Sequence, residues 1–174
     1  MGKNKSAARS VALIGVMAAI VECAKLALAA IPNVEVVTLF LALFGYVFGW
    51  RGVAAAYVFV CIEPLIYGFN TWFITYFLYW PAVAFVFMLF ASVGVRRRIP
   101  ITATAVLMTA FFGVLSSLVD VGLFTGYFDK FWYRFGIYYA RGIPFYITQI
   151  LCNAVLFPLV FVPFSRKLKA SVKF

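Results

Sequence analysis

Four ionisable side chains stand inside long apolar stretches of this sequence: Glu22, Lys25, Glu63 and Asp120. Charged groups at the depth of a bilayer are costly, so they usually face the protein interior or a wet cavity and bind a partner or a ligand. Glu63 and Asp120 are the strongest ligand-binding candidates, because each is a lone carboxylate in its apolar run. Glu22 and Lys25 are three residues apart, so they can neutralise each other or serve a ligand site.

Aromatic and hydrogen-bonding side chains recur at helical spacing around these charges. The stripes are Glu63 with Tyr67; Trp72, Tyr76 and Tyr79 or Trp80; Ser116, Ser117 and Asp120; and Tyr146, Gln149 and Asn153. Aromatic walls with a few hydrogen-bonding groups are the usual composition of a small-molecule site. Other aromatic residues near the ends of the runs fit an interfacial belt instead: Trp50, Trp132, Tyr133, Tyr138 and Tyr139.

The elements that position these residues are apolar helices. The chain is 66% hydrophobic and 11% charged, with a mean hydropathy of +1.05, whereas soluble domains have about 25% charged residues. Six apolar runs are predicted as membrane spans, at residues 9–31, 35–49, 52–68, 71–94, 101–124 and 142–164. We therefore predict an all-α integral membrane protein, a single compact bundle of six transmembrane helices. Residues 125–141 are predicted as an aromatic-rich loop that could form a lid.

The distribution of positive charge predicts the orientation. Of the 15 Lys and Arg residues, 11 lie at the N-terminus, in the turn at Arg51, in the loop at residues 96–98 or in the C-terminal tail. Cytoplasmic segments carry the excess of Lys and Arg, so both termini are predicted to be cytoplasmic. The net charge of +10 then reflects topology and contact with anionic lipid, and a nucleic-acid partner is not expected.

With this orientation the polar residues within the spans converge on the external face. We predict Asn33, Glu35, Asn70 and Arg141 at the outer rim of this face. The predicted substrate-binding residues are Lys25, Asn33, Glu35, Glu63, Tyr67, Asn70, Trp72, Tyr76, Asp120, Arg141, Tyr146, Gln149 and Asn153.

No enzyme signature is found in the sequence. It has no histidine, no phosphate-binding loop, no H-E-x-x-H and no G-x-S-x-G motif. We therefore predict no catalytic residue, no metal site and no cofactor, and any ATP that drives transport is hydrolysed by another subunit. Small residues at Ala8, Ala12, Gly15, Ala19, Cys23 and Ala27 form a strip on the first helix on which another helix can pack closely.

The segment Ala7 to Ala12, reading AARSVA, begins the first span on the cytoplasmic side. With six spans in under 200 residues and basic inner loops, it resembles the substrate-binding S components of energy-coupling factor (ECF) vitamin transporters, whose first helix carries an A-A-x-x-x-A motif. The resemblance implies that Ala7, Ala8 and Ala12 dock on a transmembrane coupling subunit, which two ATPase subunits bind. It also implies a vitamin pocket at the external face and a place in the cell membrane of a prokaryote.

Three segments look most like the cobalamin branch of that family: residues 31–35 (IPNVE), 63–68 (EPLIYG) and 142–145 (GIPF). Riboflavin, thiamine or pyridoxine could use the same aromatic residues. Two other interpretations follow from the residues alone. Glu63 and Asp120 could be the acid and base of a membrane-embedded enzyme, or the polar residues could simply pair with one another in a non-transport assembly subunit.

Overall fold

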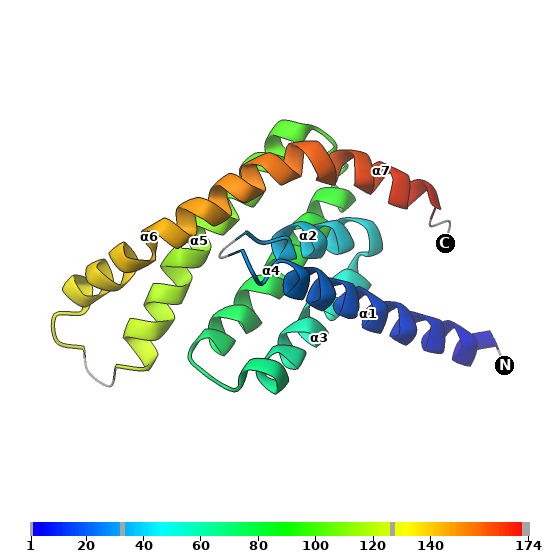
Figure 1. Ribbon diagram of the computed structural model, residues 1–174. Helices are drawn as coiled ribbons and strands as arrows, with labels where there is room; N and C mark the ends of the chain where they lie inside the picture. The colour runs from blue at the N-terminus through cyan, green and yellow to red at the C-terminus, as the bar shows by residue number, and fades with distance from the viewer. Residues whose placement is uncertain (1, 32–33, 126–127, 172–174) are drawn as a thin grey trace.

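A computed structural model describes residues 2–31, 34–125 and 128–171, and every regular element among them is a helix (Figure 1). The elements are α1 (Gly2–Ala27), α2 (Val37–Phe48), α3 (Trp50–Tyr67), α4 (Trp72–Ser92), α5 (Arg98–Leu123), α6 (Phe131–Leu156), the π-helical turn η1 (Phe157–Phe161) and α7 (Val162–Ser171). Because α6, η1 and α7 run end to end, the described chain forms six helical rods, as predicted.

Five helical stretches are long and apolar enough to cross a membrane: Ala7–Ala27, Trp50–Tyr67, Trp72–Ser92, Arg98–Leu123 and Phe131–Ser171. The shorter helix α2 has 12 residues, which at 1.5 Å per residue extend about 18 Å, well below the hydrocarbon thickness of about 30 Å. The helix predicted at residues 35–49 is therefore present, but it is shorter than a complete span.

Helix α2 is the centre of the bundle. Nine of its 12 residues are buried, and it packs against α1, α3, α4 and α6 and against the η1–α7 rod. Gly45 makes the closest of these contacts possible, because a Cβ at this position would lie 1.9 Å from the carbonyl oxygen of Ala84 in α4. The burial of α2 on all sides explains why its residues are almost uniformly apolar.

Two predicted boundaries are wrong. Helix α1 ends at Ala27, four residues before the predicted end of the first span. Residues 131–141, predicted as part of a loop, form the first turns of α6. The predicted start of the sixth span, at residue 142, therefore lies well inside α6, as does Pro144. A proline removes one backbone donor, and this loss is tolerated within apolar helices when neighbouring groups satisfy the freed carbonyl.

The last rod changes its pitch where prolines recur. After Leu156 the backbone makes one π-helical turn over Phe157–Phe161 before α7 continues to Ser171. Pro158 lies at the start of this turn and cannot donate a backbone hydrogen bond, so the α-helical ladder is interrupted there. Phe157 and Phe161 are nonetheless fully buried, and they hold the rod on the core.

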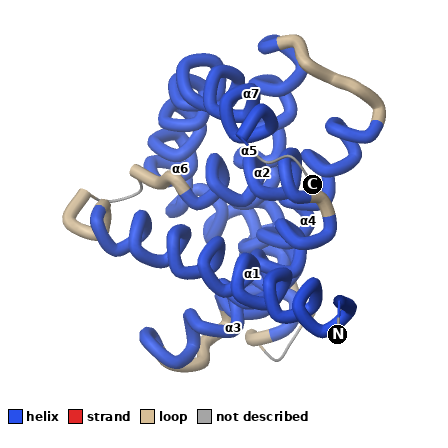
Figure 2. Tube along the Cα trace, turned by 90° about the vertical axis from the view of Figure 1, so that its right-hand side faces the viewer, coloured by secondary structure: helices blue, strands red, loops and turns tan. Residues whose placement is uncertain are grey.

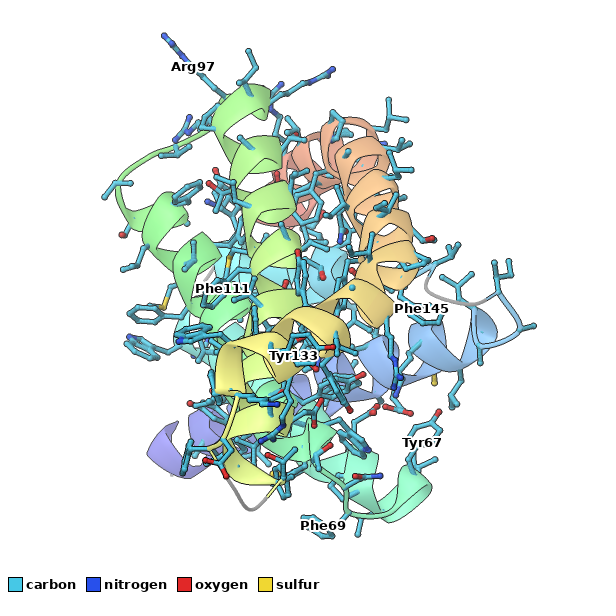
Figure 3. All side chains as sticks on the ribbon, turned by 90° about the vertical axis from the view of Figure 1, so that its left-hand side faces the viewer. Tyr67, Phe69, Arg97, Phe111, Tyr133 and Phe145 are labelled. Carbon is cyan, nitrogen blue, oxygen red and sulfur yellow. The ribbon has the colours of Figure 1, made fainter. Side chains whose placement is uncertain are left out.

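The helices define two ends of the molecule. Both termini lie on the same side of the bundle, as Figures 1 and 2 show. Arg96, Arg166 and Lys169 line one cavity, and Arg97 and Arg98 follow Arg96 in the chain; we call the end of the bundle that carries these five residues the basic end. The α3–α4 and α5–α6 connections lie at the opposite end, and Figure 3 shows Tyr67 and Phe69 far from Arg97.

Candidate functional site

A charged cluster lies between α1 and α3. Lys25 of α1 donates to Glu63 Oε2 of α3 in an ion pair. The Lys25 ammonium also lies 4.2 Å from the centre of the Tyr67 ring, one turn further along α3. Glu22 lies beside Glu63, and the two side chains belong to residues only 7% and 1% exposed. We call Glu22, Lys25, Glu63 and Tyr67 the ion cluster.

The ion cluster has unused hydrogen-bonding capacity. Neither carboxylate oxygen of Glu22 has a hydrogen-bond partner among the described residues, and the same holds for Glu63 Oε1. One lysine faces two carboxylates, so the cluster carries an excess negative charge when both are ionised. A buried acceptor without a partner costs about 1 to 3 kcal/mol. The cluster can therefore accept hydrogen bonds from a ligand or from water.

A second polar group, which we call the hub, joins four segments at the centre of the bundle. Glu35 precedes α2, Thr38 lies in the first turn of α2, Thr109 lies in α5 and Asn153 lies in α6. Asn153 Nδ2 donates to Glu35 Oε1 at 2.7 Å and to Thr109 Oγ1 at 3.0 Å. The Thr38 backbone N–H donates to Glu35 Oε2 at 2.9 Å, and its hydroxyl donates to Glu35 Oε1 at 2.6 Å.

The hub corrects the predicted position of Glu35. The sequence places this residue at the outer rim, but its carboxylate bonds to an Asn153 side chain that also contacts Thr109, near the middle of α5. The free N–H groups at the start of α2 favour a carboxylate at this point, which draws the side chain inward. The Cys152 thiol donates to the Glu35 carbonyl at 3.3 Å. These bonds anchor the end of the α1–α2 connection to α6.

Helices α4 and α5 contribute an aromatic wall, made of Trp72, Tyr76, Tyr79, Trp80 and Phe112. The Trp72 and Tyr76 rings are 5.0 Å apart, and the Tyr76 and Trp80 rings 5.5 Å. Phe112 stacks on Trp80 at 5.9 Å and meets the Tyr79 ring edge-on at 4.9 Å. Tyr79 OH and Trp80 Nε1 are buried, and neither meets a described partner with hydrogen-bond geometry, although Thr38 and Thr109 lie near the Tyr79 hydroxyl. The predicted pairing of Trp72 with Tyr76 is confirmed.

The first half of α6 carries a small cavity of about 280 Å³, lined by Tyr138, Arg141, Gly142, Phe145 and Tyr146. Figure 3 shows Tyr133 and Phe145 on the same helix, above Tyr67 of α3. The Tyr146 ring packs closely against α5 at Gly113, where a Cβ would lie only 2.6 Å from the ring. The Tyr138 hydroxyl lies near Asp120, whose Oδ1 has no partner in the described chain.

The structure groups most of the predicted site residues but not into one contact set. Lys25, Glu63 and Tyr67 belong to the ion cluster; Glu35 and Asn153 to the hub; Trp72 and Tyr76 to the aromatic wall; Arg141 and Tyr146 to the α6 cavity. Arg141 lies within α6 and is exposed. Glu63 and Asp120 have separate neighbours.

The remaining predicted residues that the structure describes belong to none of these groups. Gln149 is half-buried in α6. Asn70 is exposed and accepts a hydrogen bond from the Thr71 backbone at 2.6 Å. Asn33 lies outside the described residues.

Several residues of the hub, the aromatic wall and the ion cluster are not among the predicted substrate-binding residues. The hub needs Thr38 and Thr109, the wall needs Tyr79 and Phe112, and the ion cluster needs Glu22. Two signals were available in the sequence. Thr38 follows Glu35 by three residues, the spacing of a helix start, and Glu22 is a charge within an apolar run. The position of Thr109 had no sequence signal, since it depends on how α5 faces α6.

The predicted docking strip of α1 is uncovered. Ala7, Ala8 and Ala12 are exposed, and so are the other small residues of the strip, Gly15, Ala19, Cys23 and Ala27. A Cβ built on Gly15 would have no atom within 4 Å. The opposite side of α1 carries Met17, Ala18 and Val21, which are buried in the core. The small residues are therefore not used for packing within the described chain.

These groups together offer carboxylates, a cation, amides and flat aromatic faces, which is chemistry for binding a polar organic molecule. Among the described residues no group of three or more His, Cys, Asp or Glu side chains could hold a metal ion. Comparisons with protein-family models, with curated proteins and with solved structures find no match to this chain. A functional proposal therefore has to rest on the residues and their geometry.

Proposed function

We propose that this chain is the substrate-binding S component of an ECF importer, which captures a vitamin at the end opposite the basic end. The observation that carries the proposal is the set of buried, unpartnered polar atoms beside an aromatic wall. In the described chain these include both oxygens of Glu22, Glu63 Oε1, Tyr79 OH, Trp80 Nε1, Asp120 Oδ1 and Asn153 Oδ1. Such atoms are costly in an apolar protein unless a ligand or water satisfies them.

A vitamin can supply the hydrogen-bond partners that these buried atoms lack. Its amide, hydroxyl or ammonium groups donate to the carboxylates of the ion cluster, and a flat ring stacks on the wall formed by Trp72, Tyr76 and Phe112. Cobalamin is our preferred substrate, because its many amides suit acceptors such as Glu22 and Glu63. Riboflavin, thiamine and pyridoxine are the alternatives, since their smaller rings need the same contacts.

The uncovered small-residue strip of α1 supports the second part of the proposal, which is docking on a transmembrane coupling subunit served by two ATPases. Small side chains allow the backbones of two apolar helices to approach closely. With Ala8 and Ala12 exposed, α1 offers such a surface. In this proposal the basic end faces the cytoplasm of a prokaryotic cell, and the chain lies in the cell membrane.

The first test is to purify the protein from cells grown with mixed B vitamins and to identify bound small molecules by mass spectrometry. The purified protein is then melted with and without each vitamin. A vitamin at 100 times its Kd stabilises a folded protein by about 2.7 kcal/mol, which raises the melting temperature. If no vitamin is retained and none raises the melting temperature, the proposal is wrong and the assembly-subunit interpretation is favoured.

A matched pair of variants tests where the vitamin binds. Trp72→Ala removes an aromatic ring that contacts Tyr76 in the wall. Trp50→Ala removes an exposed ring at the start of α3, at the other end of this helix from Tyr67; this ring packs on Phe85 of α4. We expect Trp72→Ala to weaken binding of the retained vitamin by about tenfold or more and Trp50→Ala to leave it unchanged. Equal effects would exclude the aromatic wall as the binding surface.

A second pair tests docking. Ala8→Trp with Ala12→Trp places bulky rings on the strip, whereas Ile20→Trp places one on a neighbouring exposed face of α1. The double variant should no longer copurify with the coupling subunit of the same organism but should still bind the vitamin. The Ile20 variant should do both. Retained copurification of the double variant would show that the strip is not the docking surface.

A further inference from the structure

A second cavity, of about 360 Å³, opens at the basic end, far from the ion cluster. It lies between the end of α2, the α4–α5 connection, the first turn of α5 and α7. The described residues that line it are Tyr46, Arg96, Ile101, Val162, Ser165, Arg166 and Lys169. Three of these are cations and none is acidic. The proposed function makes no use of this cavity.

The cavity has a rigid floor. Tyr46, Ile101, Val162 and Ser165 are all buried. The Tyr46 hydroxyl donates to the Val95 carbonyl at 2.8 Å, which fixes the connection that carries Arg96. The Lys169 ammonium lies 3.9 Å above the Tyr46 ring, so a cation–π contact holds its side chain over the cavity. Contacts with the buried Tyr46 thus position Lys169 and the connection that carries Arg96.

No acidic side chain of the described residues lines this cavity. The sequence has five acidic residues, Glu22, Glu35, Glu63, Asp120 and Asp129. None of them is among the lining residues, and Glu63 is paired with Lys25 in the ion cluster. Two guanidinium groups and an ammonium that converge on one cavity repel each other, and an anion between them relieves this repulsion. Arginine and lysine together are typical ligands of a phosphoryl group.

The surroundings favour a lipid over a soluble phosphate. Val93 and Ile99, which lie on either side of residues 94–98, are 73% and 82% exposed. Apolar side chains exposed beside a ring of cations are typical of the membrane interface, where acyl chains and headgroups meet the protein. We propose that this cavity binds the headgroup phosphoryl of an anionic phospholipid, with Arg96, Arg166 and Lys169 contacting the phosphoryl oxygens. This inference does not depend on the proposed function.

The test uses the full-length protein in nanodiscs that contain phosphatidylglycerol and phosphatidylcholine in equal amounts, followed by delipidation and native mass spectrometry of the lipids that remain bound. We expect phosphatidylglycerol to be retained in preference to phosphatidylcholine, and millimolar inorganic phosphate not to displace it. Equal retention of the two lipids would overturn the proposal. Displacement by inorganic phosphate would also overturn it and assign the cavity to a soluble anion.

Charge-matched variants separate this cavity from general attraction to the surface. Arg166→Gln with Lys169→Gln removes two cavity cations, whereas Arg97→Gln with Lys167→Gln removes two exposed cations that do not line the cavity. The first pair should weaken phosphatidylglycerol retention by about 30-fold and the second only slightly. Equal losses would overturn the proposal. Arg96→Gln, in an exposed connection, provides a single variant that should fold normally and still lose part of the retention.

Discussion

The ion cluster is built around two buried carboxylates and the hub around one half-buried carboxylate, and the hydrogen-bonding capacity of these groups is satisfied to different degrees. In the hub, the Glu35 carboxylate accepts hydrogen bonds from the Thr38 N–H, the Thr38 hydroxyl and Asn153. In the ion cluster, one lysine faces two carboxylates, and three of the four carboxylate oxygens have no partner in the described chain. The hub is therefore a polar group that holds the fold together, whereas the ion cluster has free acceptor atoms that can bind a ligand.

The two groups flank the same connection. Lys25 lies two residues before the end of α1, and Glu35 lies just before the start of α2. The hub ties the second end of this connection to α5 and α6 through Asn153. A ligand that binds the ion cluster therefore contacts α1 close to the start of the α1–α2 connection, and the hub fixes the other end of this connection at Glu35. The variants that follow test the difference between the two groups.

The largest effect is expected from Lys25→Met. Removing the cation leaves Glu63 and Glu22 buried without an opposite charge, and breaking a buried pair on one side costs about 3 to 5 kcal/mol. Chemical unfolding in detergent micelles should show a correspondingly lower free energy of unfolding. The double variant Lys25→Met with Glu63→Leu should recover most of this loss. A single variant as stable as the original chain would show that Lys25 is not needed to neutralise the carboxylates.

Asn153→Leu is expected to come next, because it removes the two side-chain hydrogen bonds that Asn153 donates to Glu35 and Thr109. The loss should be about 2 to 3 kcal/mol, since the Glu35 carboxylate and the Thr109 hydroxyl each lose a buried partner. Gln149→Leu, one turn earlier on α6 and half-buried, is the control and should melt within a few degrees of the original chain. Similar melting temperatures for the two variants would contradict the structural role of the hub.

Thr38→Val should have a smaller effect, about 1 kcal/mol. Valine keeps the shape of the side chain and removes its hydroxyl, while the backbone N–H of residue 38 and Asn153 still bond to Glu35. Thr38→Ser retains the hydroxyl and should keep the Glu35 hydrogen bond. The unfolding free energies of the two variants give the contribution of this one bond. A more stable valine variant would mean that the bond is not formed in solution.

The smallest effect on stability is expected from Glu22→Gln, within about 1 kcal/mol of the original chain. The substitution breaks no protein hydrogen bond of the described chain and reduces the repulsion between Glu22 and Glu63. If the proposed function is right, it should still weaken vitamin binding, because a carboxylate acceptor is lost. The same unfolding measurement together with a binding titration checks both parts. A large loss of stability would place Glu22 with the hub as a structural residue.

The helices were predictable to a large extent. Each predicted apolar run corresponds to a helix. The predicted stripe of Glu63 with Tyr67 is also present, because both side chains contact the Lys25 ammonium. The loop predicted over residues 125–141 was wrong from Phe131 onward, where α6 begins. Pro144 lies inside α6, and whether a helix continues past a proline depends on the groups that surround it, which come from other parts of the chain. The partners of Glu35 likewise come from other elements, because its half-buried carboxylate bonds to Asn153 of α6.

The sequence by itself determined that the chain is all-helical, the order of its helices and the apolar character of the long ones. These properties follow from the length of apolar runs and the position of charges, which act locally along the chain. Only the tertiary structure decided which polar groups meet. Lys25 pairs with Glu63, 38 residues away, and not with Glu22 on its own helix, while Asn153 reaches Glu35 across 118 residues. A buried charge takes the partner that helix packing brings to it, and packing is set by the whole chain.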